Sequence, residues 1–557
     1  MFRKSFLLQF LLENLRTVEL KRFCWPLLLM TLSLSAGACY ADIALPKIFS
    51  DHMVLQRERS MRIWGTAEPK QELMIKLSDQ KVAAVANAKG DWSAVINTGP
   101  AGGPYELEIK AVDESTKVVF SNVLIGEVWI CGGESNMQMK VAETENADAM
   151  VEAAKRFPKL RLFNVAHNAA NKPLKDFAKV DPWFCCSSET VQDFSAIGYF
   201  FGCNLQQSLQ VPVGIINVSR SATTLEAWMP YVAVEQDGSF AEMLDYWKEK
   251  NEPNNPNRVS NSFNGMIAPL TRFPVAGVNW YQGETNVGRG AQYQRLFPLM
   301  INSWRRQFKS PKLPFLFVQL APYRYEDHSK MALAEVWDAQ LKTFKSVKNC
   351  GMIVSGDVGD VKSPTPRNKI PVAQRLARWA LANCYQPGQA KTKAANKVAD
   401  LANSIQTAGA SAQADTTATD SSGGNDVPVE PAAPANKKRE VERKSAKVNF
   451  CGPIYESFKI EGDRIAVSFS NADSGLFASD SADLHISICG EDHEFKVAET
   501  AIEGSLLIVR HPTISKPIAV RYAWHDTAES TLFNLQGLPA SPFRTDDFPL
   551  TSEGVEF

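Results

Sequence analysis

Residues 123–137 read VLIGEVWICGGESNM, an apolar run that ends in two glycines before Glu134 and Ser135. A buried strand that ends in small residues leaves the hydroxyl of a following serine accessible. If a helix begins at this serine, its first free N–H groups face a developing oxyanion and its dipole favours negative charge. Many serines after such a glycine are only helix N-caps. Ser135 is therefore a candidate nucleophile, with an N-cap as the alternative.

A second stretch of the same kind lies further along the chain. Residues 263–270 read FNGMIAPL and run into GVNWYQGETN at residues 277–286. The pattern again indicates an apolar strand followed by a polar, glycine-containing turn. In an open α/β sheet, ligands bind beyond the carboxyl ends of the strands. We therefore expect both turns to lie at the same edge of one sheet.

Residues 123–386 show the alternation of strands and helices that is typical of an α/β domain. Continuous apolar runs, as in a parallel sheet covered on both faces, lie at residues 278–280, 315–320 and 352–354. Helical patterns cover residues 293–308 and 331–346. The order predicts a doubly wound parallel sheet. The segment 231–259, polar and rich in Asn and Pro at its end, is expected to arch over the site.

The flanking segments indicate further domains, as expected for a chain of 557 residues. Residues 42–122 and 447–557 carry short alternating runs with turn signals, which predict two β domains. Residues 387–446 are a low-complexity tract with too little apolar content to offset its ordering entropy, so we predict a disordered insert. No repeat, P-loop or dinucleotide fingerprint is present in the sequence.

Residues 1–41 have the features of a signal peptide. Basic residues precede an apolar stretch that is too short for a membrane span, and small residues offer a cleavage point after Ala41. We expect export to the periplasm or the medium, with lipid attachment at Cys39 as a weaker alternative. The formal net charge of -1 gives no reason to expect nucleic acid or an anionic membrane as a partner.

The cysteines do not indicate a metal site. Eight of them follow residue 41, without the spacing of metal ligands. In an exported protein, one to three disulfides are expected. Cys131, on the strand before Ser135, is interpreted as a small core residue rather than a second nucleophile.

Together, the two stretches resemble the sialate O-acetylesterase family, serine esterases of the SGNH-hydrolase type. That family carries Gly-Gln-Ser-Asn-Met at the nucleophile and Trp-Tyr-Gln-Gly-Glu-Ser-Asn at the second loop. The likeness extends over nearly the whole mature chain and includes residues 53–57, 64–67, 102–105, 520–524 and 537–546. It implies an SGNH/flavodoxin-like sheet and hydrolysis of O-acetyl esters on sialic acid or another sugar. It implies no metal and no cofactor.

The departures from the family pattern lie at the catalytic positions. Residues 363–369 read SPTPRNK, where the family has Asp-Ile-His-Pro-x-Asn-Lys. Thr365 therefore stands where the resemblance places the histidine base, and Ser363 stands where it places the aspartate. Neither hydroxyl can accept a proton near neutral pH, so Ser135 lacks its activator.

Further changes lie around the oxyanion region. The family's Gly-Gly-Thr is Ser-Ala-Thr at residues 221–223. Ala222 keeps its N–H, so a donor survives if the backbone does not require positive φ. The resemblance implies the N–H groups of Ser135 and Ala222 and the side chain of Gln282 as oxyanion donors. Glu134 replaces the family's glutamine, and its carboxylate would repel an oxyanion unless burial keeps it protonated.

The resemblance implies that Glu284 organises the second loop rather than transferring protons. Asn286, in the same loop, is a further candidate for oxyanion or substrate binding. Thr285 replaces the family's serine, the mildest of these changes.

Among the seven histidines, His328 is the best substitute base. It follows the predicted strand at residues 315–320, so its loop should open on the same rim as Ser135, although a rim histidine is more often simply solvated. Two functions follow. One is a carbohydrate esterase of reduced activity that uses Ser135. The alternative is a catalytically inactive paralogue that binds acetylated glycan or serves as a scaffold.

Overall fold

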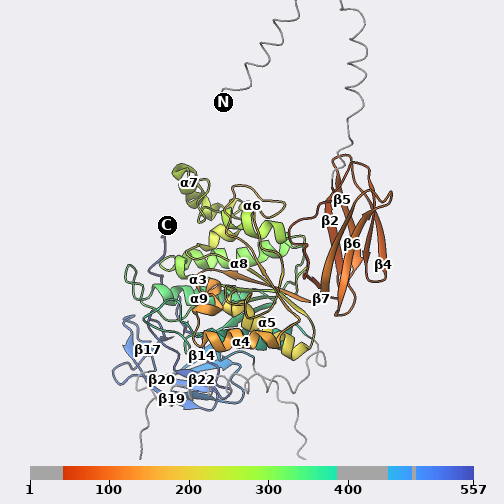
Figure 1. Cartoon of the computed structure of the whole chain (residues 1–557). Coiled ribbons are helices and arrows are strands. Elements are labelled where there is room, and N and C mark those ends of the chain that lie inside the picture. The colour runs from red at the N-terminus through yellow and green to blue at the C-terminus, as the bar shows by residue number, and fades with distance from the viewer. Residues whose placement is uncertain (1–41, 386–449, 480–483, 557) are drawn as a thin grey trace, which may run out of the picture.

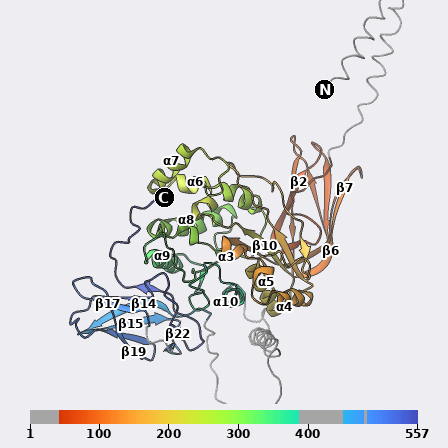
Figure 2. The same ribbon diagram turned by 60° about the vertical axis from the view of Figure 1, so that its left-hand side comes forward.

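The structure is a computed structural model that describes residues 42–385, 450–479 and 484–556 (Figure 1, Figure 2). Its centre is a sheet with the strand order β13-β12-β11-β7-β10-β8-β9. These strands are β7 (Lys117–Gly133), β8 (Leu160–Asn164), β9 (Phe184–Cys185), β10 (Val213–Ser219), β11 (Gly277–Tyr281), β12 (Phe315–Val318) and β13 (Cys350–Ile353). All neighbours along this path are parallel except β9, which is antiparallel to β8. The α/β fold class predicted from the sequence is confirmed.

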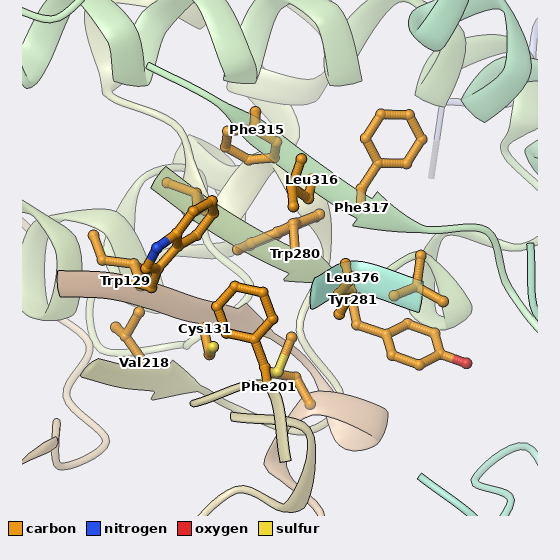
Figure 3. Packing of buried hydrophobic residues seen from close by; sticks show 14 of the residues in the cluster. Trp129, Cys131, Phe201, Val218, Trp280, Tyr281, Phe315, Leu316, Phe317 and Leu376 are labelled. Carbon is orange, nitrogen blue, oxygen red and sulfur yellow. The ribbon is translucent and has the colours of Figure 1, made fainter. Parts of the chain in front are cut away.

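Helices cover both faces of the central sheet, which explains why its strands are largely apolar. On one face α5 (Ala196–Leu209) packs on α10 (Ile370–Asn383), and on the other α8 (Gly290–Gln307) packs on α9 (Ala332–Ser346). In Figure 3, Trp129 of β7 lies against Phe201 of α5, with ring centroids 5.0 Å apart. Burying one such large side chain contributes about 1.5–3 kcal/mol, so this core holds the strand ends of the site in place.

The amino-terminal β domain is continuous with the central sheet through β7. Its other strands are β1 (Val54–Gln56), β2 (Ser60–Thr66), β3 (Glu72–Leu77), β4 (Gln80–Val85), β5 (Asp91–Asn97) and β6 (Gly102–Ala111). The first part of β7 pairs with β6, and its second part pairs with β10 and β11. The domain boundary that we placed between residues 122 and 123 thus falls within one strand of 17 residues.

In the described residues, the carboxyl-terminal β domain consists of two four-stranded antiparallel sheets and one antiparallel pair, which lie below the central sheet in Figure 1. Its strands are β14 (Ile454–Glu461), β15 (Arg464–Ser470), β16 (Leu476–Ala478), β17 (Ile486–Cys489), β18 (Lys496–Val497), β19 (Glu499–Glu503), β20 (Leu506–Arg510), β21 (Ala519–Tyr522), β22 (Leu532–Asn534) and β23 (Phe543–Arg544). The expected signal peptide and the expected insert at residues 387–446 lie outside the described residues.

The prediction of a strand within residues 263–270 is wrong. Phe263–Ile267 form the π-helical turn η5 and Ala268–Leu270 the 3-10 turn η6, and only the later part of the stretch is a strand. Gly265 packs directly on a neighbouring loop, since a Cβ there would lie 2.3 Å from the carbonyl oxygen of Asn168. Apolar content alone could not distinguish this buried turn from a strand.

The segment at residues 231–259 is largely helical. It contains α6 (Tyr231–Glu235), η4 (Gly238–Phe240) and α7 (Ala241–Lys250), which lie above the sheet in Figure 1. The remaining short helices are α3 (Ser135–Gln138), η1 (Val141–Glu143), α4 (Ala147–Ala153), η2 (Ala154–Arg156), η3 (Leu225–Trp228) and η7 (Glu284–Asn286). No helix within the described ranges is long and apolar enough to cross a membrane.

The disulfides expected from the cysteine count do not form. All eight cysteines of the described residues are free, and most are buried. Cys131 lies inside β7, where burial raises the pKa of its thiol to about 12. Such a thiol stays protonated and serves as a small apolar residue of the core.

Candidate active site

Ser135 is the first residue of α3 and follows directly on β7, the central strand of the sheet. The turn requires glycine at position 133, because φ there is +137° and a Cβ would lie 2.0 Å from the carbonyl oxygen of Tyr281. The N–H of Glu134 donates to the same oxygen at 2.9 Å. β11 therefore fixes the turn, and Ser135 is left half-buried at the carboxyl edge of the sheet. Because α3 has four residues, its first N–H groups rather than a long helix dipole can contact an anion.

The loop after β10 brings Ala222 to the same edge. The N–H of Arg220 donates to the carbonyl of Gly133 at 2.9 Å, and the N–H and hydroxyl of Ser221 both donate to Gln138 Oε1, at 2.6 and 2.9 Å. These bonds tie the loop to both ends of the nucleophile turn. Ala222 has φ +54°, a left-handed conformation that costs a residue with a side chain about 1 kcal/mol. The alanine thus adopts a backbone conformation that is more usual for glycine. Its main-chain N–H remains available as a donor.

Gln282 and Asn286 hold the second loop together from within. The amide nitrogen of Gln282 donates to the carbonyl of Thr223 at 3.2 Å and to Asn286 Oδ1 at 2.7 Å. Asn286 Oδ1 also accepts from the N–H of Leu225 at 2.9 Å, and Nδ2 donates to Glu226 at 3.1 Å. Both side chains are fully buried. Their amides therefore join the loops after β10 and β11.

Glu134 and Glu284 form a buried carboxyl pair beside Ser135. Glu134 Oε1 accepts from the N–H groups of Gly283 and Thr285, at 3.0 and 3.3 Å, and Oε2 accepts from the Thr285 hydroxyl at 2.5 Å. Burial, with the adjacent Glu284 carboxylate to which it is hydrogen-bonded, raises the pKa of Glu134 well above its usual value. Burial and the contact with a second carboxyl group therefore favour the neutral form of Glu134.

Asn136 connects this pair to the segment that follows β13. Its Nδ2 donates to Glu284 Oε1 at 2.5 Å and to the carbonyl of Pro364 at 2.8 Å. The ammonium group of Lys369 donates to Asn136 Oδ1. Burial lowers the pKa of Lys369 to about 7, against the opposing effect of Glu284. The nucleophile helix and residues 363–369 are thus held together by buried hydrogen bonds.

Thr365 and Ser363 lie in this anchored segment and are both half-buried. The N–H of Thr365 donates to the Ser363 hydroxyl at 3.3 Å, and Arg367 Nε donates to the carbonyl of Glu143 at 2.8 Å. The positions that the resemblance assigns to the base and its partner are therefore next to α3. They carry two hydroxyl groups that cannot accept a proton near pH 7.

His328 is exposed and lies beside the second loop. A Cβ added to Gly288 would be 2.6 Å from its Nδ1, so the ring packs on that glycine, just beyond η7. Within the part of the chain that the structure describes, Ser135 Oγ has no hydrogen bond to His328 or to any other histidine.

Three residues at this edge were not among the sequence-based candidates. His167, beyond β8, is hydrogen-bonded to the backbone of Ser219; partial desolvation and the charge of Arg220 lower its pKa. Asn136 and Lys369 form the buried network described above. The intact Pro-x-Asn-Lys at residues 366–369 was the available signal for Lys369, whereas nothing in the sequence pointed to His167.

The described residues contain no group of three His, Cys, Asp or Glu side chains that could hold a metal ion. What the site offers is a serine hydroxyl at a strand end, with main-chain N–H groups near it. This is the arrangement of an α/β serine hydrolase.

The comparisons with known proteins narrow this class to carbohydrate esterases. Residues 125–381 match the model of the family described as carbohydrate esterase, sialic acid-specific acetylesterase. The sialate O-acetylesterases of Pongo abelii and Homo sapiens are 30% identical to the chain over 372 and 373 residues, 60% of this chain and 70% of each relative. The crystal structure of XAC1771, a carbohydrate acetylesterase from Xanthomonas citri, superposes with a TM-score of 0.74 at 27% identity, covering 91% of this chain and all of that one. The chain therefore belongs to the sialic acid-specific acetylesterase family, which confirms the resemblance seen in its motifs.

Proposed function

We propose that this protein is a carbohydrate O-acetylesterase of reduced activity, with Ser135 as its nucleophile. The proposal rests on one observation above all. Residues 363–369 are hydrogen-bonded to the nucleophile helix through Asn136 and Pro364 at 2.8 Å, yet they present Thr365 and Ser363 in place of a base and its partner. The scaffold for the reaction is present and the proton acceptor is missing.

In the proposed reaction Ser135 Oγ attacks the carbonyl carbon of an acetyl ester on sialic acid or another sugar. The N–H groups of Ser135 and Ala222 stabilise the oxyanion. The bond to the sugar oxygen breaks, the sugar leaves as an alcohol, and water then releases acetate from the acetyl-serine. Without a histidine, the serine proton passes to solvent, which makes the first step slow. The neutral state of Glu134 keeps a carboxylate charge away from the oxyanion.

Three further candidates receive supporting roles in this proposal. Gln282 and Asn286 position the loops, since their amides are engaged with one another and with the protein. Glu284 orients Asn136. His328, exposed and packed on Gly288, is not part of the proposed proton transfer.

The alternative is an inactive paralogue that binds acetylated glycan. The replacement of both partners of the serine, at Thr365 and Ser363, favours it. In serine hydrolases that lose a member of the triad, oxyanion and binding contributions leave about 10³–10⁴-fold acceleration over water. The two functions therefore differ in whether any turnover depends on Ser135.

The test is hydrolysis of p-nitrophenyl acetate and of an O-acetylated sialic acid by the purified mature protein, beside Ser135→Ala. Slow turnover that is abolished in the variant is expected. Equal background in both proteins, with unchanged folding by circular dichroism, would reject the esterase for these substrates and leave glycan binding.

We also propose that the protein is exported by way of residues 1–41. Their basic start, apolar stretch and small residues before position 42 support this. Amino-terminal sequencing of the secreted or periplasmic protein should begin at Asp42. A start at Cys39 would indicate lipid attachment instead, and an uncleaved chain in the cytoplasm would contradict export.

A further inference from the structure

A cleft of about 1430 Å³ lies between the amino-terminal β domain and the helical side of the α/β domain. It is lined by residues of β2 and β5, by the loop after β8, by α6 and α7, and by η5 and η6. None of the residues placed around Ser135 lines it. In Figure 1 β2 lies on the side of the β domain that faces α6. The cleft is thus a second concave site, separate from the nucleophile.

Aromatic side chains and polar groups share the lining of this cleft. Trp64, Trp92 and Trp247 contribute to its walls, and Tyr231 at its rim is 49% exposed. Small-molecule sites combine apolar and aromatic walls with a few placed polar groups. A sugar ring matches such a lining, because it presents C–H groups on its faces and hydroxyls at its edge.

Two buried polar atoms in the lining have no hydrogen-bond partner among the residues that the structure describes. These are Trp92 Nε1 and Ser260 Oγ, and both residues are more than nine-tenths buried. Ser260 also has φ +71°, a left-handed conformation that its surroundings must impose. Buried polar groups normally have hydrogen-bond partners, so these two atoms are exceptions in the wall of the cleft, although neither is open to solvent in this structure.

The charges of the cleft favour an acidic ligand. Four basic side chains and two acidic ones contribute to the lining, and one of the acids, Asp176, is ion-paired with Lys47 outside it at 3.5 Å. The guanidinium of Arg272 lies 4.5 Å above the ring of Trp64 and is exposed. An exposed guanidinium can bind a carboxylate through two parallel N–H donors.

One segment connects the cleft to the loop of Ala222. Asn257 donates to the carbonyl of Ala222 at 3.1 Å and accepts from the N–H of Thr224 at 2.9 Å. The next residue, Arg258, lines the cleft and donates to the carbonyl of Trp247 at 2.5 Å. The support of the proposed oxyanion loop and the wall of the cleft are therefore consecutive residues.

We propose that this cleft binds an acidic oligosaccharide, the glycan chain that carries the acetylated sugar. Arg272 binds a carboxylate of the chain, and Tyr231 packs on a sugar ring. The choice of a carbohydrate rests on the proposed function, but binding at the cleft is measured without catalysis.

The test uses Ser135→Ala protein, titrated calorimetrically with a hexamer of α2,8-linked sialic acid and, separately, with the neutral hexamer of glucose, maltohexaose. The acidic hexamer should bind, and Arg272→Ala or Tyr231→Ala in the same background should each weaken it by roughly tenfold, the value of one good charged or aromatic contact. Lys459→Ala removes an exposed cation of the carboxyl-terminal domain and should change nothing. Thermal unfolding checks that each variant is folded.

Binding of the acidic hexamer that neither cleft variant weakens would overturn the proposal, as would equal binding of the neutral hexamer or no binding at all. The esterase assay distinguishes the two proposals, because Ser135-dependent hydrolysis of p-nitrophenyl acetate is measured on the unsubstituted protein, whereas binding at the cleft is measured on Ser135→Ala protein. If the protein shows no Ser135-dependent turnover but still binds the acidic hexamer through Arg272, this inference stands and the proposed function is rejected.

Discussion

Replacing Thr365 with histidine and Ser363 with aspartate should restore a proton acceptor beside Ser135. The backbone of this segment is already anchored, because the Pro364 carbonyl accepts from Asn136 at 2.8 Å. Arg367 holds the segment on its other side, through the carbonyl of Glu143 at 2.8 Å. Both replaced side chains are half-buried, so the larger groups have solvent-facing space. The substitutions therefore change side chains on a fixed segment.

The magnitude follows from what a positioned base contributes. General base catalysis accelerates a reaction by about 10²–10⁴-fold, which lowers the barrier by roughly 2.7–5.5 kcal/mol. Thr365→His alone should give a smaller gain, since no carboxylate then orients the imidazole. Ser363→Asp alone should give none, because it adds no base at the serine.

The assay is kcat/KM for p-nitrophenyl acetate and an O-acetylated sialic acid between pH 5 and pH 9. The double variant should show a rate that rises with loss of the imidazole proton, near the usual histidine pKa of about 6.5, and then levels off. The unsubstituted protein should instead follow hydroxide concentration without a plateau. Ser135→Ala in the double variant is the control and should remove the gain. A folded double variant no faster than the parent would refute the placement of residues 363–365 beside the nucleophile.

Three other substitutions test the geometry of the site. Gly133→Ala places a Cβ 2.0 Å from the Tyr281 carbonyl at φ +137° and should lower the free energy of unfolding by roughly 3 kcal/mol in urea titration. Ala222→Gly relieves the left-handed alanine at φ +54° and should raise that free energy by about 1 kcal/mol, whereas a loss would show that the strain is absent. Glu134→Gln replaces a neutral acid by a neutral amide. Because the folded pKa of Glu134 is raised above its ordinary 4.5, wild-type stability falls as the pH rises from 4.5 towards the folded pKa, and the stability of the variant relative to wild type should increase as the pH rises above 4.5. An advantage independent of pH would mean that Glu134 is ionised in the folded protein.

The central sheet was predictable because its signals are local. The strand leading to Ser135 and the strand at residues 277–281 are continuous apolar runs that end at glycine-containing turns. The helices at residues 290–307 and 332–346 follow from periodicity. Residues 263–270 are equally apolar but form helical turns, because Gly265 meets the backbone of a loop nearly a hundred residues earlier. The two residues of that contact are too far apart in the chain for a local sequence pattern to reveal it.

The site was predictable in position but not in its connections. Gly133, Ser135 and the second loop could be placed at one edge from the order of strands and turns. The hydrogen bond from Lys369 to Asn136 joins residues 233 positions apart. Both side chains are buried only in the folded chain, so neither the bond nor their burial could be predicted from the sequence. The disulfide expectation also failed, since all eight cysteines of the described residues are free and a count along the chain could not show this.

The buried charges explain why the scaffold persists without its base. Asn136 lies between a basic group, Lys369, and an acidic one, Glu284, and is hydrogen-bonded to both, while burial favours the neutral form of Glu134 beside them. Removing one partner of such a network leaves an uncompensated buried charge and is strongly destabilising. Thr365 and Ser363 contribute no charge to it. The base can therefore be lost while the nucleophile turn stays in place, which is why two substitutions suffice to test whether the site can still perform the reaction.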